Sequence, residues 1–251
     1  MKITKAARNT FSLLALASAL AASSSALAGP ADKVYIPRVE MGETEFELRG
    51  GYKDFPGGVN EYATVFDLGY SVNNWWKTEL VVEYSGQPGL GSSFEAWEWE
   101  NLFLLTEQGK YWADVGLLIE YEHTFADGPD ELKISPLFQK EIGPTIANLN
   151  LIFQHEVGRG AGDATELGYA WQLKWRGKES LEWGMQGFGG IGVLGNLGEA
   201  DSHSIGPAIF GVQRLANGNK LAYDAAVLAG LNNQSPDLTV RFQLEYEMYK
   251  H

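Results

Sequence analysis

Acidic residues recur at every second position in several segments of the chain. Glu43, Glu45 and Glu47 form the first such run, and Glu98 and Glu100 form another. Side chains two residues apart lie on the same face of a β-strand, so each run places its carboxylates on one face. A carboxylate-lined surface attracts cations and repels anions, as charged walls do in selective pores. The pattern favours a surface that binds or passes small polar or cationic solutes.

These acids sit within segments whose apolar residues also alternate, which is the signal of a half-buried strand. No helical stretch separates the segments, and the turns between them are alternately short, as at 108–109, and longer, as at 86–93. We expect about twelve strands, which begin near Phe46, Tyr62, Trp76, Trp97, Tyr111, Leu132, Ala147, Leu167, Leu181, Ile205, Leu221 and Leu238.

This layout predicts an all-β fold, a single closed antiparallel transmembrane β-barrel with meander topology and about twelve strands. Pro136 and Pro207 fall inside two of the proposed strands. Proline cannot donate to a β-ladder, so each predicts a bulge or a strand end. If one hairpin is misdrawn, the alternative is ten strands.

Composition excludes several classes of protein. The 251 residues include 30 Gly and no Cys, and the formal net charge is −13. The absence of Cys excludes a disulfide framework, a thiolate metal site and a lipid-anchored N-terminal Cys. The acidic balance argues against nucleic acid as a partner. No cofactor is expected.

The N-terminus has the features of an export signal. Lys2, Lys5 and Arg8 precede an apolar stretch over 11–22, and Ala26-Leu27-Ala28 has the small-x-small cleavage pattern. We predict a signal peptide over 1–28, a periplasmic N-terminal arm over 29–39 and the barrel over 40–251. The arm either hangs in the periplasm or folds into the bore.

Alternation assigns the two faces of the barrel. Apolar residues face lipid, so polar residues face the lumen. The lumen-lining residues that set selectivity are expected to be Glu45, Glu47, Arg49, Glu79, Glu83, Glu98, Glu100, Asp114, Glu120, Lys174, Arg241 and Glu245. The aromatic residues expected at the lipid interfaces are Trp76, Tyr84, Trp97, Tyr111, Tyr121, Trp175, Trp183 and Tyr246.

The final segment, Val240-x-Phe242-x-Leu244-x-Tyr246, resembles the C-terminal strand of bacterial outer-membrane barrels of the small porin-like type. The opening segment over 34–50 looks like the start of uncharacterised proteobacterial envelope barrels. The resemblance implies the outer membrane of a Gram-negative bacterium. It also implies contact with outer-membrane lipid and surface glycolipid, and with the barrel-assembly machinery through the C-terminal strand. This chain departs from the usual aromatic end, since Lys250 and His251 follow Tyr249.

Three functional hypotheses follow. The first is an outer-membrane channel that passes small polar or cationic solutes through an acidic lumen. The second is a plugged barrel with a structural or surface-interaction role. The third is a lipid-active enzyme, which the absence of a His-x-Ser pair disfavours. His123, His155 and His203 all fall near the longer loops but lack the spacing of a metal site.

Overall fold

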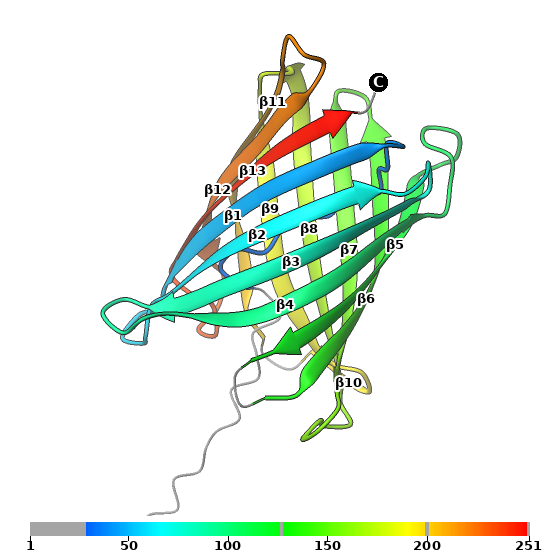
Figure 1. The fold of residues 1–251 in the computed structure, drawn as a ribbon. Coiled ribbons are helices and arrows are strands. Elements are labelled where there is room, and N and C mark those ends of the chain that lie inside the picture. Colours follow the sequence, from blue (N-terminus) through cyan, green and yellow to red (C-terminus); the bar gives the residue numbers. More distant parts are fainter. Residues whose placement is uncertain (1–28, 126–127, 199–200, 250–251) are drawn as a thin grey trace, which may run out of the picture.

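The computed structural model describes residues 29–125, 128–198 and 201–249, and they form an antiparallel β-barrel (Figure 1). The predicted signal peptide lies outside the described residues. The strands are β1 (Glu43–Asp54), β2 (Glu61–Ser71), β3 (Trp76–Gln87), β4 (Gly91–Leu104), β5 (Asp114–Thr124), β6 (Asp130–Ile142), β7 (Thr145–Val157), β8 (Thr165–Lys178), β9 (Leu181–Val193), β10 (Asn196–Leu197), β11 (His203–Arg214), β12 (Lys220–Gly230) and β13 (Leu238–Tyr249).

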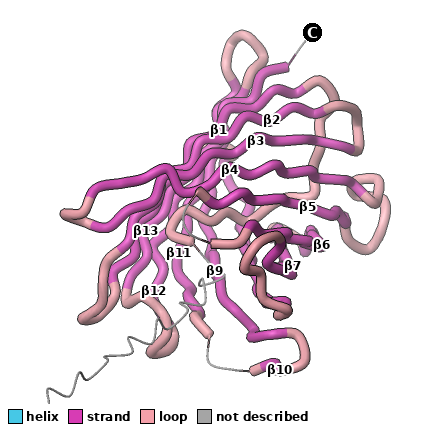
Figure 2. The backbone as a smooth tube through the Cα atoms, turned by 60° about the horizontal axis from the view of Figure 1, so that its bottom comes forward, coloured by secondary structure: helices cyan, strands magenta, loops and turns pink. Residues whose placement is uncertain are grey.

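Each long strand pairs with its neighbours in the chain, and β1 closes the ring by pairing with β13 from Glu43–Tyr249 to Asp54–Leu238. β10 is a two-residue extension that pairs only with β9 and lies at the rim of the barrel (Figure 2). Twelve strands therefore close the barrel, and the predicted twelve-stranded meander is confirmed over the ten-stranded alternative.

The two strand prolines do not act as expected. Pro136 lies within β6 opposite Leu117, and Pro207 lies within β11 opposite Met185, without a shift of register. The register instead shifts between Glu83 and Tyr84 in the β3–β4 pair and at two places in the β8–β9 pair. Pro136 is not paired with β7, and Pro207 is not paired with β12. On that side of the strand, where a residue with an N–H would donate, the ladder is interrupted without a bulge.

Two connections also differ in length from the prediction. The expected short turn at 108–109 is a connection over 105–113, because β5 begins only at Asp114. The expected longer connection at 86–93 shrinks to 88–90, because β3 and β4 extend toward each other.

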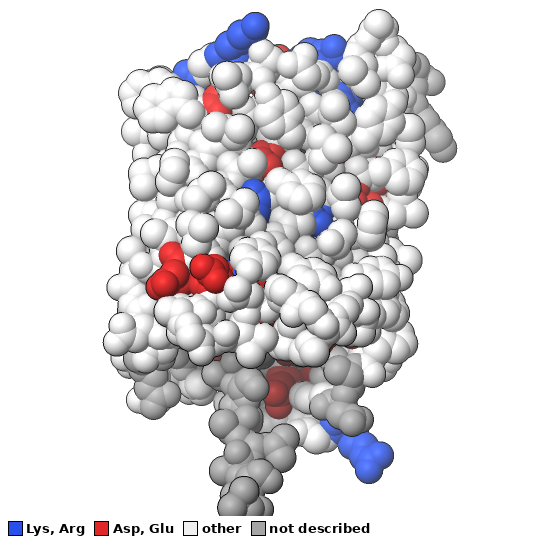
Figure 3. All heavy atoms as spheres, turned by 90° about the vertical axis from the view of Figure 1, so that its left-hand side faces the viewer, with Lys and Arg blue, Asp and Glu red and all other residues white. Residues whose placement is uncertain are grey.

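The barrel wall separates an apolar outside from a polar inside. On β1 the residue Phe46, on the outward face, is 49% exposed, whereas its neighbours Glu45 and Glu47 on the inward face are 2% and 4% exposed. Uncharged residues make up most of the outer surface in Figure 3. This reverses the soluble pattern and fits a wall in contact with lipid. Within the described residues no helix is long and apolar enough to cross a bilayer.

The N-terminal arm lies inside the barrel rather than in the periplasm. Ala31, Lys33, Val34 and Val39 are all buried, and each contacts inward-facing residues of the wall. The chain therefore passes through the lumen before it enters β1.

Candidate functional site

Residues 29–40, which we call the plug, run through the lumen from the loop end to the end that holds the C-terminal residues. The carbonyl of Pro30 lies so close to Gly51, near the outer end of β1, that a side chain there would collide with it. At the other end of the plug, Arg38 Nη2 donates to Glu247 Oε1 at 3.0 Å. Since Glu247 pairs with Lys220 at the opposite end of the strands, the plug spans most of the bore.

One side of the lumen is lined by carboxylates from β1 to β5. We call this set the acidic wall: Glu45, Glu47, Asp67, Glu79, Glu98, Glu100 and Glu120. Every member is less than a tenth exposed. The even spacing of Glu98 and Glu100, and of Glu45 and Glu47, places their side chains inward on the same face of each strand.

Lys33 of the plug lies against the acidic wall. Its Nζ is 3.2 Å from Asp67 Oδ2 and 3.3 Å from Glu47 Oε1, and Glu79 Oε1 follows at 3.7 Å. The lysine side chain is 5% exposed and the three carboxylates are at most 1% exposed. Because buried charges need compensation, the ammonium offsets carboxylates that would otherwise repel one another.

Two cations of the wall itself complete this network. Lys77 Nζ lies 2.5 Å from Glu45 Oε2 and 3.0 Å from Glu79 Oε1. Arg49 Nε lies 2.7 Å from Glu47 Oε1, and its Nη1 donates to the carbonyl of Ala31 in the plug at 3.4 Å. Gly69 provides the space, since a Cβ there would lie 2.9 Å from Lys77 Cε.

Tyr35 joins the two sides of the lumen. Its hydroxyl donates to Glu100 Oε1 at 2.7 Å. Its backbone N–H donates to Asn150 Oδ1 at 2.8 Å, and its carbonyl accepts from Asn150 Nδ2 at 2.9 Å. A single amide side chain therefore satisfies both backbone groups of a residue that has no strand partner.

The opposite side of the lumen carries a row of buried or half-buried amides. We call this set the amide wall: Gln139, Asn148, Asn150, Gln154, Gln172 and Gln186, from β6 to β9. Hydrogen bonds of 3.0–3.2 Å link Gln139 to Asn148, Asn148 to Gln172 and Gln172 to Gln186. The ladder ends at Arg241, which donates to Gln186 and to Asp224.

Apolar contacts fill the space between the polar groups. Val34 packs in a buried cluster with Ala170, Phe188 and Phe210, among others. Because Lys33 and Val34 are adjacent in an extended segment, they point to opposite walls. The plug thus presents charge to the acidic wall and an aliphatic side chain to the other wall.

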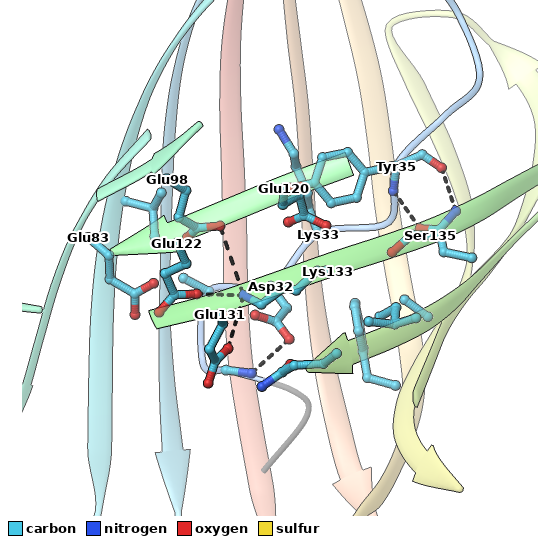
Figure 4. Close-up of a pocket in the computed structure, with 18 of the residues that line it drawn as sticks. Asp32, Lys33, Tyr35, Glu83, Glu98, Glu120, Glu122, Glu131, Lys133 and Ser135 are labelled. Atoms are coloured by element: carbon cyan, nitrogen blue, oxygen red, sulfur yellow. Dashed lines mark hydrogen bonds and ion pairs between the residues drawn. The ribbon is translucent and has the colours of Figure 1, made fainter. Parts of the chain in front are cut away.

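The plug divides the lumen into two chambers. The outer chamber has a volume of about 240 Å³ and is shown in Figure 4. Lys133 extends into it and lies 2.6 Å from Glu122 and 3.9 Å from both Glu98 and Glu131. The inner chamber has a volume of about 80 Å³, and Lys33 and Tyr35 line both chambers. These two plug residues therefore lie between the two chambers.

The structure places the predicted lumen residues as follows. Nine of them are buried on the inward face: Glu45, Glu47, Arg49, Glu79, Glu98, Glu100, Asp114, Glu120 and Arg241. Glu83 lines the outer chamber and Glu245 lines the inner chamber. Lys174 lies apart from the acidic wall and pairs with Glu182 at 3.4 Å.

The predicted set lacked Asp67, Lys33 and the amide wall. The alternation of Asp67 with Phe66 and Leu68 does indicate that its side chain faces the lumen. The inward amides also alternate, at Asn148 and Asn150, but without a charge they gave no signal of a site. Nothing local to Lys33 indicates that its partners lie 14 to 46 residues further along the chain.

The eight predicted interface aromatics lie on the outward face of the strands or in turns. Trp175 and Trp183 stack with ring centroids 6.0 Å apart, and both are exposed. Several polar tips have partners: Trp76 Nε1 donates to Asn101 at 3.0 Å, Tyr121 donates to Asp130 at 2.6 Å, and Tyr246 accepts from Asn219 at 2.7 Å. Tyr84 packs against Phe94, Trp97 against Tyr121, and Tyr111 lies exposed beside Lys110.

The three described histidines do not converge. His123 contacts Asp130, His155 contacts Thr165, and His203 contacts Tyr169. Among the described residues, the groups of carboxylates close enough to hold a metal ion contain no histidine. No described histidine ring hydrogen-bonds a serine or asparagine side chain, the pair that a lipid-active enzyme would require.

Comparison with known proteins adds fold-level information. No protein-family model matches the chain, and no curated protein is significantly similar to it in sequence. Among solved structures, the COG4313 outer membrane channel from Pseudomonas putida F1 aligns with a TM-score of 0.56 at 11% identity, over 88% of this chain and 98% of that one. The outer membrane protein Omp33 from Acinetobacter baumannii aligns less well, with a TM-score of 0.40 at 11% identity, over 84% and 100% of the two chains. The first of these alignments shows that the chain shares its fold with an outer-membrane β-barrel channel.

Proposed function

We propose that the chain is an outer-membrane channel of a Gram-negative bacterium that its own plug closes at rest. The observation that carries the proposal is the position of Lys33, whose ammonium lies 3.2 Å from Asp67 and 3.3 Å from Glu47 within the bore. A small cation in an open bore would meet the same carboxylates, so the acidic wall would favour cations and disfavour anions. The solutes would be small polar or cationic molecules.

The plug is held by side-chain contacts rather than by backbone pairing with a strand, which supports a plug that can move. Among the described residues, no backbone–backbone hydrogen bond joins residues 29–39 to a strand. The contacts are made by side chains or reach the plug backbone from side chains, as at Asn150 and Arg49. Withdrawal of the plug would therefore break no β-ladder. The ring of hydrogen-bonded strands could stay intact while the bore opened.

A second candidate is a permanently plugged barrel with a structural or surface-interaction role. The filled bore favours it, because the plug leaves chambers of about 240 and 80 Å³ on either side of it. In that case the pairs between the plug and the acidic wall would serve to fill the barrel.

Conductance across planar bilayers separates the two candidates. The wild-type protein is compared with a variant that lacks residues 30–39, after migration on unboiled gels shows that both are folded barrels. We expect small or rare currents from the wild type and larger, cation-selective currents from the deletion variant. No current from the folded deletion variant would favour the plugged structural barrel.

The source of selectivity is tested in the same deletion background. Glu47→Gln combined with Asp67→Asn removes two carboxylates from the acidic wall, so the reversal potential in a salt gradient should move toward the nonselective value. The matched control is Glu107→Gln, an exposed acid in the connection between β4 and β5, and it should leave the reversal potential unchanged.

A further inference from the structure

The plug begins in the outer chamber. Gly29 lines that chamber, and its backbone nitrogen donates to Asp32 Oδ2 at 2.7 Å. The next residue, Pro30, is held against β1 at Gly51, where only a glycine leaves room for its carbonyl. The position of the Gly29 nitrogen is therefore determined by packing on one side and by the Asp32 carboxylate on the other.

The outer chamber has more carboxylates than cations. Six carboxylates line it: Asp32, Glu83, Glu98, Glu120, Glu122 and Glu131. The three lining cations are Lys33, Arg49 and Lys133. Lys33 and Arg49 make their closest ion pairs with Glu47 and Asp67, outside this chamber. Lys53 lies near enough to Asp32 to attract it electrostatically, yet the acids still outnumber the cations.

We propose that the outer chamber binds one more cation, the α-ammonium group of Gly29, which forms when the signal peptide is cut after Ala28 and which then pairs with Asp32. Hydrolysis of the Ala28–Gly29 peptide bond by a leader peptidase adds water across it. Ala28 leaves as a carboxylate, and Gly29 keeps the nitrogen as an amine that is protonated near neutral pH. The single uncharged N–H donor at this point becomes a cationic group with three donors.

This change strengthens the existing contact between the Gly29 nitrogen and Asp32. A hydrogen bond between an ammonium group and a carboxylate is roughly twice as strong as one from a neutral donor. The new charge also reduces the excess of acid around Glu83 and Glu98, which face the same chamber (Figure 4). Processing of the leader would thus create the group that secures the outer end of the plug, so closure would follow export. The inference rests on the proposed plug, but not on whether the barrel conducts.

The test measures the N-terminus and its reactivity. The protein is exported with its own leader, purified folded, and its intact mass is recorded; we expect a chain that begins at Gly29. An acetyl N-hydroxysuccinimide ester is then added near pH 7, and peptide mass spectrometry separates the α-amine from lysine side chains. We expect acylation of the α-amine in the folded protein to be about tenfold slower than in urea, because the ion pair withholds the nitrogen lone pair.

Variants identify the partner. Asp32→Asn should raise the acylation rate of the folded protein several-fold toward the rate in urea, and Asp32→Glu should restore protection. The control is Asp163→Asn, an exposed acid in the connection between β7 and β8, which should change nothing. A mature chain that starts elsewhere, or an α-amine that reacts equally fast folded and unfolded, would overturn the inference. So would an Asp32→Asn variant with wild-type protection. If the Gly29 α-amine is protected from acylation but the barrel never conducts, the proposed channel function is wrong and the Gly29–Asp32 pair still stands.

Discussion

The acidic wall and the amide wall hold opposite sides of the same short plug by different means. The acidic wall carries buried carboxylates in excess of its own cations, and the plug supplies Lys33 to it. In the amide wall, four side chains from Gln139 to Gln186 bond to one another without the plug. The acidic wall therefore depends on the plug, whereas the amide wall mainly determines where the plug lies, through Asn150.

The comparison implies that loss of the charge should matter more than loss of the amide. Removing one partner of a buried ion pair strands the other charge, which is costlier than losing a neutral hydrogen bond. The first three of the following changes test that order through the open fraction of the channel or the exposure of the plug, and the fourth tests an ion pair outside the barrel wall.

Lys33→Met should have the largest effect. It leaves Glu47, Asp67 and Glu79 without the plug cation, at a cost of roughly 3–5 kcal/mol. We expect a plug that leaves the bore and a channel that is open for most of a single-channel recording. Lys110→Met, at an exposed pair in the β4–β5 connection, is the control. An unchanged open fraction in Lys33→Met would contradict the role of the acidic wall.

Asn150→Ala should have the next largest effect. It leaves the N–H and the carbonyl of Tyr35 without partners, which costs about 1–3 kcal/mol. The amide hydrogen of Tyr35 should exchange with solvent at least several-fold faster, as measured by hydrogen-exchange mass spectrometry. Asn217→Ala, in an exposed turn, should leave exchange at Tyr35 as in the wild type. Slow exchange in both variants would show that the amide wall does not hold the plug.

Val34→Ala should have a smaller effect. The valine belongs to a buried cluster with Ala170 and Phe188, and the removal of its two methyl groups costs roughly 1.5–2 kcal/mol. The open fraction should rise less than in Lys33→Met. Equal rises in the two variants would mean that apolar packing, not charge, closes the bore.

Arg214→Ala should have the smallest effect, because its partner lies outside the barrel wall in an exposed turn. A hydrogen bond from Arg214 lowers the pKa of Glu179 below its usual value. A carboxylate with a lowered pKa adds stability above its ordinary pKa and loses it as the pH falls through the lowered value. Both groups are exposed, so we expect no measurable change in unfolding. An NMR titration should show the Glu179 pKa returning toward its usual value; an unchanged titration would rule out this pair.

The barrel could be predicted from sequence because alternation is local. Phe46, Phe66 and Leu80 each mark the outward face from neighbours one or two residues away, and the inward face follows. The strand prolines were interpreted wrongly because the cost of a missing donor depends on which neighbour the N–H would face, and that depends on register.

The plug could not be predicted in the same way. Lys33 meets Glu79, and Tyr35 meets Asn150, across separations of 46 and 115 residues that no local pattern encodes. Residues 29–39 lack the alternating hydrophobicity of a strand. The sequence was therefore compatible both with an arm in the periplasm and with an arm inside the bore. The signal peptide lies outside the described residues and remains a prediction.

The central claim is that the plug closes the bore, and a reversible tether tests it most directly. The chain has no cysteine, so Val34→Cys with Ala170→Cys, two positions in one buried cluster, introduces a single pair of thiols. We predict that the oxidised protein forms the disulfide and carries no current, and that a reductant added to the same bilayer restores the small or rare currents expected of the wild type. Equal currents in the oxidised and reduced states, with the disulfide shown to be formed, would contradict the account.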